Sequence, residues 1–250
     1  VGGAMQDLPD EETFKTMVKN FINDDLSVAL NDLDGLLSRN RIFIDRTADV
    51  GVLSKENALA WSSTGPIARA SGVRRDVRKD EPYLCYADNW DGEGAEAVKF
   101  SVPLGSKGDV YERFQVRLEE AKQAMSIIMQ LIDNIPGGPI DTFADSKMVK
   151  PRKDEVYGSI EGLIQHFELV MTNRGWQAPV AEVYGCNETA NGELGFYTIS
   201  DGGPRPWRTK TRPPSFINYS LMPQLIEGHM LADIVAVLGS LNIVAAELDR

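Results

Sequence analysis

The sequence predicts an α+β fold in which long helices of a bundle are joined to a small antiparallel sheet, as three observations indicate. Apolar residues recur at helical spacing over residues 10–38, 109–134 and 153–173. From Pro179 onward the pattern changes to short strands. The last part of the chain returns to helical spacing. With 250 residues, the chain is long enough to bury a substantial core.

The three long helices are predicted from their apolar stripes and from the residues that end them. The first stripe, over residues 10–38, includes Phe14, Phe21 and Leu30. The second helix, over 109–134, should stop at "IPGG", because proline and paired glycines do not continue a helix. The third, over 153–173, is followed by "NRG", which is typical of a helix C-cap. These stripes are most simply explained as core.

The strands are predicted in the last third of the chain. "AEVYGCNE" (181–188) and "ELGFYTIS" (193–200) alternate in polarity and are separated by "TANG", which indicates a hairpin. "TKTRPPSF" (209–216) should form a third extended piece. Two helices are then expected, over 214–228 and 229–240. We therefore expect a mainly helical region over residues 1–175 and a small sheet with C-terminal helices over 176–250, together forming one domain of a longer protein.

Composition argues against several classes of protein. The net charge of −11 argues against nucleic-acid binding, which needs a positive surface. Cys85 and Cys186 lie far apart and belong to no CxxC or zinc motif, so we expect reduced thiols. His166 and His229 have no ligand partner at a standard spacing, and no metal site is predicted. Neither GxGxxG nor GxxxxGK[ST] occurs, so no phosphate-binding loop is expected.

No membrane or export segment is predicted. The start, "VGGAMQDLPD", is acidic and lacks an apolar signal region. The apolar tract at 234–246 is shorter than the roughly 20 residues that a membrane-spanning helix requires. The first residue is Val1 rather than methionine, which fits a fragment.

A basic segment lies between the first two predicted helices. "GPIARASGVRRDVRKDEPYLCY" (65–86) contains five basic residues in an otherwise acidic protein: Arg69, Arg74, Arg75, Arg78 and Lys79. One interpretation is a solvated basic loop. The other is a docking segment in which Arg69, Arg74, Arg75 and Arg78 meet carboxylates of a partner, since the guanidinium fork suits such contacts.

Four segments carry a resemblance to a known family. "GPIARASGVRRDVRKDEPY", "GDVYERFQVRLEE", "GELGFYTISDGGPRPWRTKTRPPSF" and "GHMLADIVAVLGSLNIVAAELDR" together resemble the 49-kDa-type (D-type) subunit of NADH-quinone oxidoreductase, respiratory complex I. The likeness runs over nearly the whole chain, in order and with similar spacing. Four long motifs in series are far more specific than a single short pattern.

The resemblance implies a fold, an activity and partners. The family's members share ancestry with the large subunit of [NiFe] hydrogenases and lie in the peripheral arm, at the cytoplasmic face of the bacterial inner membrane. With the neighbouring iron–sulfur subunit, which holds the terminal [4Fe–4S] cluster, they form the quinone chamber of a proton-translocating complex that uses NADH. In the family, a histidine and a tyrosine in the first half of the protein meet the quinone headgroup. That half is expected to be absent here, so this chain alone should bind no cofactor and be inactive.

The resemblance also singles out the C-terminal strip. In [NiFe] hydrogenases the C-terminal motif D-P-C-x-x-C-x-x-H ligates nickel through its cysteines. Laid on this sequence without a gap, its aspartate, two cysteines and histidine fall on Asn242, Val244, Glu247 and Arg250. Nickel and iron need soft thiolates there, so the strip should line an emptied metal cavity, reused around the quinone. Glu247 should be paired with Arg250, Arg69 or another arginine, because an unpaired buried carboxylate is costly.

A second segment supports the same interpretation. "ETANGELGFY" resembles the family's "EAPKGEFG", which is akin to "EAPRGE" in hydrogenases, where the arginine overhangs the active site. Here Asn191 stands at the basic position, and Asn242 replaces the family's usual aspartate near the end. Both departures remove a charge.

Other interpretations remain open. The strip from Ser240 to Arg250 could serve only for packing. The chain could belong to a related membrane-bound oxidoreductase with another electron donor, which neighbouring genes would identify. It could also be a non-catalytic scaffold, and binding of quinone analogues to the assembled complex would separate that case from the enzyme.

Overall fold

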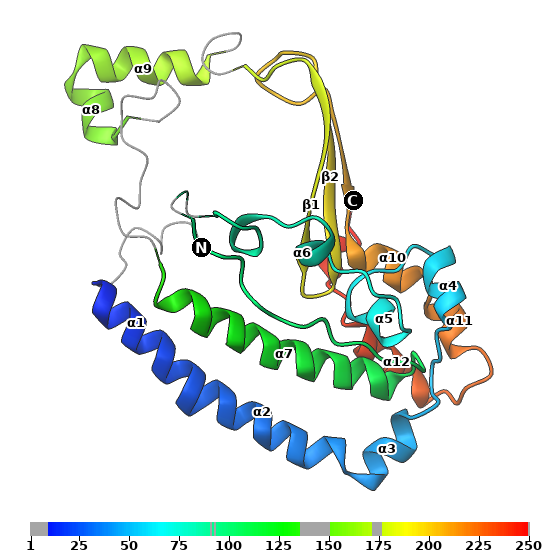
Figure 1. Cartoon of the computed structure of the whole chain (residues 1–250). Helices are drawn as coiled ribbons and strands as arrows, with labels where there is room; N and C mark the ends of the chain where they lie inside the picture. Colours follow the sequence, from blue (N-terminus) through cyan, green and yellow to red (C-terminus); the bar gives the residue numbers. More distant parts are fainter. Residues whose placement is uncertain (1–9, 91, 93, 136–150, 172–176, 250) are drawn as a thin grey trace. The chain divides into compact units, whose positions relative to one another are not determined.

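A computed structural model describes residues 10–90, 92, 94–135, 151–171 and 177–249 of the chain (Figure 1). The chain forms two compact units. Unit 1 comprises Val1–Pro136, Cys186–Leu194 and Arg212–Arg250, and unit 2 comprises Gly137–Gly185 and Gly195–Thr211. This division passes through the strands, so it differs from the predicted boundary between residues 175 and 176.

The first predicted helix, over 10–38, is confirmed. Helices α1 (Glu11–Asn20) and α2 (Ser27–Leu33) are continuous through π-helical turns at Phe21–Leu26 and Asp34–Ser38. Asp10 caps the start, where its carboxylate accepts a hydrogen bond from the Thr13 N–H at 3.0 Å. A short helix, α3 (Arg41–Thr47), follows and is capped by the Asn40 side chain. Both α1 and α3 contact the next long helix.

That helix, α7 (Val110–Ile132), confirms the prediction over 109–134 and is the longest described helix of unit 1. Asp109 caps it by accepting the Glu112 N–H at 2.7 Å. Figure 1 shows α1 and α2 running alongside α7. Arg113, on its inner face, is fully buried, and its Nη2 donates to the carbonyls of Gly51 (2.6 Å) and Gly108 (2.8 Å). Burial lowers the pKa of Arg113 to about 10, so this guanidinium is still charged at neutral pH.

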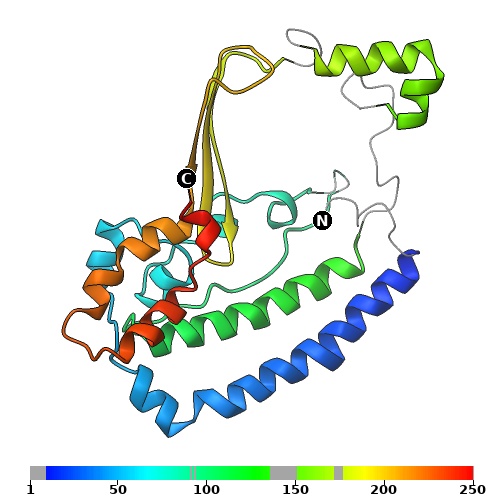
Figure 2. The ribbon, with the colours of Figure 1, turned by 180° about the vertical axis from the view of Figure 1, so that it is seen from behind.

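The core lies where α7 meets a group of short helices. These are α4 (Lys55–Ala60), α5 (Gly65–Ala70), α10 (Pro214–Ser220), α11 (Met222–Ile226) and α12 (Asp233–Leu241). Figure 2 shows α12 beside the N-terminal half of α7, with α10 and the short turn Ala245–Glu247 close by. The apolar residues buried together in this core are Leu53, Ala58, Ile67, Ala68, Val73, Val110, Leu221, Leu225, Val237 and Leu241.

The two predicted C-terminal helices form three shorter ones. The prediction over 214–228 corresponds to α10 and α11, which are separated at Leu221, just before Pro223 in the first turn of α11. The prediction over 229–240 began too early, because Gly228 has a positive φ of 81° and α12 starts only at Asp233. There the Asp233 carboxylate accepts the N–H of Met230 at 3.1 Å.

The basic segment 65–86 is not a continuous loop, which corrects that prediction, although residues 71–76 and 81–83 are irregular. It contains α5, α6 (Val77–Asp80) and a 3₁₀ turn at Leu84–Tyr86. Every residue of α5 is buried. The misreading came from counting charges, because Arg69, Arg75 and Arg78 find carboxylates within the chain, as described below.

The predicted hairpin is confirmed. Strands β1 (Ala181–Thr189) and β2 (Gly192–Ser200) are joined through Ala190 and Asn191, and β3 (Arg208–Arg212) completes an antiparallel sheet of order β1-β2-β3. The third predicted piece, 209–216, is extended only as far as Arg212, since α10 begins at Pro214.

In unit 2 the helix predicted over 153–173 is two helices, α8 (Lys153–Gly158) and α9 (Ile160–Val170). Ser159 between them is extended, with φ −136° and ψ 150°, and its Oγ accepts the Gly162 N–H at 3.0 Å. Gly158 ends the first helix and Ser159 caps the second. The expected stop signals "PGG" and "NRG" lie outside the described residues.

We predict that Gly65→Ala destabilises unit 1 by about 2–5 kcal/mol. Gly65 has φ +74°, and an added Cβ would lie 2.5 Å from the Asn191 carbonyl oxygen. Gly35→Ala is the matched control, because nothing lies within 4 Å of its Cβ position and alanine favours helix by up to about 1 kcal/mol. Urea unfolding should show a loss of stability for the first variant and a slight gain for the second. Equal midpoints would refute the close approach of α5 to the hairpin turn.

Candidate functional site

A buried ion cluster joins α5, α6, α7 and β1 within unit 1. Arg69 of α5 is 1% exposed. Its Nε donates to Glu120 Oε1 of α7 at 2.6 Å, and its Nη1 donates to Glu188 Oε1 of β1 at 2.8 Å and to the Arg75 carbonyl at 2.9 Å. Asp76 lies 3.6 Å from the same Nη1. Arg69 is therefore saturated by partners in its own chain.

The neighbouring pair Asp76–Arg78 completes the cluster. Arg78 donates to both oxygens of Asp76, at 2.9 and 2.6 Å, and its guanidinium lies 4.7 Å above the ring centre of Phe100. Burial by itself would raise the pKa of Asp76, but the hydrogen bonds and charge of Arg78 and the charge of Arg69 hold it below its ordinary value. Asp76 is thus an ionised partner for both arginines.

The pKa of Glu188 is shifted in the opposite direction from that of Asp76. Its side chain is 4% exposed, and its Oε2 accepts the Val77 N–H at 3.1 Å. Burial raises the pKa of Glu188 above its ordinary value, although Arg69 opposes the shift. A buried carboxyl group that retains its proton more readily than in water is a candidate for a role in proton transfer.

A cavity of about 350 Å³ opens beside this cluster, and we call it the arginine cavity. Its polar wall is formed by Arg69, Arg78, Tyr86, Arg117, Glu120 and Glu188. Its remaining wall includes the small side chains of Ala121 and Ala124 and the end of β1. Arg117 has no carboxylate within 4 Å among the described residues, unlike Arg69 and Arg78. A cavity of this size suits a small ligand or the head of a larger one.

The two segments singled out by the resemblance meet next to this cavity. The Asn191 Nδ2 donates to the Asn242 carbonyl at 2.8 Å, and the Asn242 Nδ2 donates to Asn191 Oδ1 at 2.8 Å. Asn191 is 5% exposed and lies in the turn between β1 and β2. Asn242 is the left-handed C-cap of α12, with φ 52°. Two positions 51 residues apart in the sequence therefore form a reciprocal amide pair.

The other described residues of the strip lie against α10. The Val244 N–H donates to Ser215 Oγ at 3.3 Å, and Val244 is 43% exposed. Glu247 Oε2 accepts the Ser215 N–H at 2.9 Å, so this carboxylate caps the start of α10. The expectation of an arginine partner is not met within residues 10–249 as described, since a backbone N–H takes that place. Arg250, the fourth predicted residue, lies outside the described residues.

The predicted docking arginines occupy different environments. Arg69 is buried and paired internally, which corrects its proposed docking role. The Arg75 side chain is 39% exposed and lies 3.2–3.7 Å from Glu81, Glu193 and Asp80. Arg78 is tied to Asp76. Arg74 is exposed and forms no ion pair with the described residues, so the docking hypothesis now applies mainly to Arg74.

Sequence reasoning missed Arg117, Glu120 and Glu188 as site residues. Arg117 and Glu120 were part of the matching segment "GDVYERFQVRLEE", and Glu188 begins "ETANGELGFY". The available signal was that charged residues at helical spacing on α7 would face the buried side together with Arg113. Their long sequence separation from Arg69 hid the pairing.

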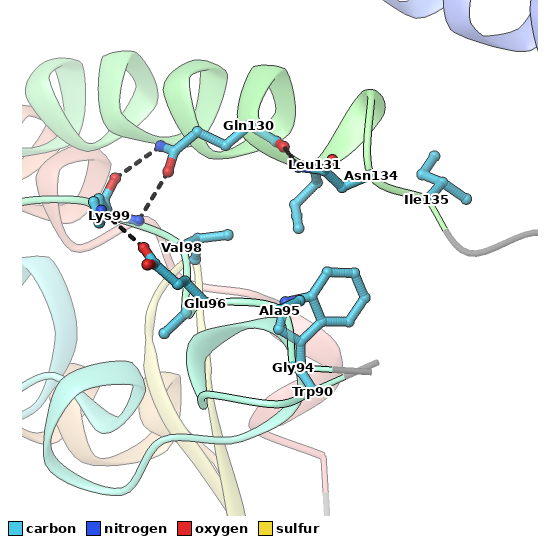
Figure 3. A pocket seen from close by; sticks show the side chains of 11 residues that line it. Trp90, Gly94, Ala95, Glu96, Val98, Lys99, Gln130, Leu131, Asn134 and Ile135 are labelled. Carbon is cyan, nitrogen blue, oxygen red and sulfur yellow. Dashed lines mark hydrogen bonds and ion pairs between the residues drawn. The ribbon is translucent and has the colours of Figure 1, made fainter. Parts of the chain in front are cut away.

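A larger hollow among the described residues of unit 1 lies elsewhere. It has a volume of about 870 Å³ and lies between the extended segment that follows Gly94 and the C-terminal end of α7 (Figure 3). Gln130 binds both backbone groups of Lys99, at 2.9 and 2.8 Å. The charged pair Glu96–Lys99 is about four-fifths exposed. No predicted site residue lines this open groove, so we place the candidate site at the arginine cavity.

The described residues form neither a metal-binding cluster nor a membrane-spanning helix. No three or more His, Cys, Asp or Glu side chains in the described part of the chain are arranged to hold a metal ion. None of the described helices combines the length and apolar character needed to cross a bilayer. Exposed His229 accepts the Gly51 N–H through Nε2 at 3.3 Å, which is a structural contact.

Comparison with known proteins places the chain in a family. Residues 1–250 match the family model described as respiratory-chain NADH dehydrogenase, 49 Kd subunit. The chain belongs to this family. Its α+β fold agrees with the prediction made from the resemblance.

Several relatives are similar over the whole chain. The D-type subunit of NADH-quinone oxidoreductase from Pelobacter propionicus is 44% identical over 100% of this chain and 58% of the relative. The D-type subunit from Methylacidiphilum infernorum is also 44% identical, over 100% and 56%. The C/D-type subunit from Bdellovibrio bacteriovorus is 42% identical, over 100% and 42%. The chain thus spans a little over half the length of the D-type relatives it matches.

We predict that Glu188→Gln changes how stability depends on pH. Because the pKa of Glu188 is raised in the folded state, this group should contribute a loss of stability as pH rises from about 4.5 through the raised value. Glutamine mimics the protonated acid, so this loss should disappear and the variant should gain relative to wild type as pH rises. Urea midpoints measured across this range test it. Glu119→Gln, an equal charge change at a half-exposed site, should keep the wild-type slope, and a wild-type slope in Glu188→Gln would contradict the assignment.

We predict that charge is tolerated unequally at the two asparagines. Asn191→Lys adds a cation at a buried position 3.4 Å from Arg117, and should cost about 2–4 kcal/mol. Asn242→Asp places a carboxylate near that guanidinium and should cost about 1 kcal/mol or less. In the double variant the new charges can pair, so it should be more stable than the sum of the single losses predicts. Urea unfolding of the four proteins gives the coupling free energy, and strict additivity would rule out a direct contact.

Proposed function

We propose that this chain supplies part of the wall of the quinone chamber of an NADH:quinone oxidoreductase. Family membership and the printed names of its relatives support this. In this proposal the electrons reach the quinone from a [4Fe–4S] cluster in a neighbouring iron–sulfur subunit, and NADH is oxidised elsewhere in the complex. This chain supplies shape, fixed charges and hydrogen-bond donors, and proton translocation belongs to the whole complex.

One observation carries the proposal. The two segments whose resemblance points to an ancestral metal cavity are joined directly, through the reciprocal pair Asn191–Asn242. A strip that only packed, or segments that matched by chance, would have no reason to converge. They converge beside a cavity whose wall includes three arginines and two carboxyl groups, of which Glu188 is buried.

The chemistry of the cavity suits quinone reduction. Reducing a quinone to a quinol adds two electrons and two protons, so negative charge develops on the ring oxygens before protonation. Guanidinium donors stabilise such charge, most strongly where water is excluded. Glu188, whose pKa is raised by burial, retains its proton more readily than a carboxyl group in water and is a candidate proton donor to the reduced quinone.

The surface of unit 1 supports a place within an assembly. We propose that the protein is peripheral, at the cytoplasmic face of a bacterial inner membrane, and reaches the membrane only through its partners. Exposed Arg74, which has no carboxylate partner among the described residues, is the candidate for charge-complementary docking.

The test is Glu247→Gln in the full-length protein within its assembled complex. Glutamine keeps an acceptor oxygen for the Ser215 N–H, so folding and assembly should be preserved. If the strip forms part of the chamber wall, as proposed, quinone reductase activity should fall roughly three- to tenfold, which corresponds to a change of about 1 kcal/mol in the activation free energy. Steady-state NADH oxidation with a soluble quinone measures this.

The matched control is Asp249→Asn, which removes an exposed charge two residues away and should change little. Electron transfer from NADH to an artificial soluble acceptor should be normal in both variants, which shows that the input side is intact. Normal quinone turnover and normal inhibitor response in Glu247→Gln would show that the strip has a packing role, and the proposal would fail for this segment.

A further inference from the structure

Arg117 connects the two segments that meet at the candidate site. Its Nη1 donates to the Ala190 carbonyl at 3.3 Å and to Asn191 Oδ1 at 3.4 Å, both in the hairpin turn. Its Nη2 donates to the carbonyls of Ser240 and Leu241 at 3.4 Å each, at the end of α12. One guanidinium on α7 therefore spans both sides of the Asn191–Asn242 pair.

The partners of Arg117 are of a different kind from those of Arg69. Arg69 forms short contacts of 2.6 and 2.8 Å with carboxylates, whereas the four contacts of Arg117 are longer and all go to neutral oxygens. Two of these oxygens are the last carbonyls of α12, which carry the negative end of the helix dipole. Burial lowers the pKa of Arg117, with Glu120 opposing and Arg69 adding to the shift. The contacts of Arg117 thus depend on geometry more than on ion pairing.

A second arginine of α7, Arg113, also contacts α12. Arg113, one helical turn earlier, donates through Nη1 to Ser240 Oγ at 3.1 Å. It lies deeper and is anchored to Gly51 and Gly108. Arg113 fixes α12 to the core, and Arg117 reaches from the same helix to the strip itself.

Arg117 also lines the arginine cavity. Its Nε is buried and has no hydrogen-bond partner among the described residues. The same side chain therefore borders the space where a ligand would sit and holds the segment that leads to Val244 and Glu247. Long, neutral contacts are easier to rearrange than short ionic ones.

We propose that Arg117 is a positioning residue of the quinone-chamber wall, which holds the hairpin turn and the C-terminal strip in register. Only the expected effect of Arg117 on quinone binding rests on the proposed function. The positioning itself follows from the contacts. The alignment of the Asn191–Asn242 pair then depends on Arg117. A ligand that contacts Arg117 in the arginine cavity would therefore also affect the position of the C-terminal strip.

The first experiment measures position without activity. Hydrogen exchange by mass spectrometry on the assembled complex compares wild type, Arg117→Met, Arg117→Lys and Lys122→Met. Lys122 lies on the same helix but pairs with Asp34 and Glu119, so its loss controls for removal of a cation. Exchange in peptides covering 190–192 and 241–247 should rise several-fold in Arg117→Met, less in Arg117→Lys, and not in the control.

The second experiment measures the effect on quinone in the same complexes. Arg117→Met should raise the KM for a soluble quinone and the half-inhibitory concentration of a quinone-site inhibitor several-fold, while electron transfer to an artificial acceptor stays normal. Arg117→Lys should recover part of this loss, because it keeps the charge but not the fork. A uniform fall in both activities would indicate general instability and contradict the positioning role.

Hydrogen exchange tests the positioning role of Arg117, and quinone kinetics test the assignment of the strip to the quinone chamber. Unchanged exchange at 190–192 and 241–247 in Arg117→Met overturns the positioning role. Raised exchange with normal quinone kinetics and inhibitor response supports the positioning role and overturns the assignment of the strip to the quinone chamber. If Arg117→Met does not assemble, Arg117→Lys decides both points by the same measures.

Discussion

The structure of unit 1 depends on the buried guanidinium of Arg69. It ties α5 to α7 through Glu120, to β1 through Glu188, and to the segment before α6 through the Arg75 carbonyl. Removing one partner of such a buried pair typically costs about 3–5 kcal/mol, because the other charge is left uncompensated. The end of β1 is held in place by this contact, and the hairpin turn that carries Asn191 follows it directly. The position of the candidate site therefore depends on the ion pairs of Arg69, which lie outside the apolar core.

Arginines serve three different purposes in this small region. Arg69 is neutralised by carboxylates and joins segments of the fold. Arg113 is charged, and it binds backbone carbonyls and a hydroxyl, so α7 holds α12 through hydrogen bonds of this guanidinium to neutral groups. Arg117 shares the neutral type of partner but borders a cavity. The environments, rather than the residue type, distinguish a structural cation from one placed to meet a ligand.

Periodicity predicted the elements whose formation is local. The helices over 10–38 and 109–134 and the hairpin around "TANG" needed only spacing, caps and turn residues, all contained in short windows. The break at Ser159 was missed because a continuous apolar stripe outweighed the Gly158–Ser159 pair in the prediction. The basic segment was misread because its carboxylates, Glu120 and Glu188, lie 51 and 119 residues from Arg69. No local pattern reports such a pairing. The meeting of Asn191 and Asn242 could be anticipated only through the resemblance, which named both positions without showing that they touch.

The Asn191–Asn242 pair has a consequence for the conditions under which the site keeps its shape. Its two hydrogen bonds involve only amide and carbonyl groups, none of which gains or loses a proton in the ordinary range of acidity. Dissolved ions screen attraction between charges, with a Debye length of about 8 Å at physiological ionic strength, but they have little effect on such neutral contacts. The joint between the turn and α12 is thus indifferent to salt, while the more exposed ionic contacts around Arg75 weaken as salt is added. The two hydrogen bonds of this pair therefore keep their strength over a wide range of acidity and salt concentration.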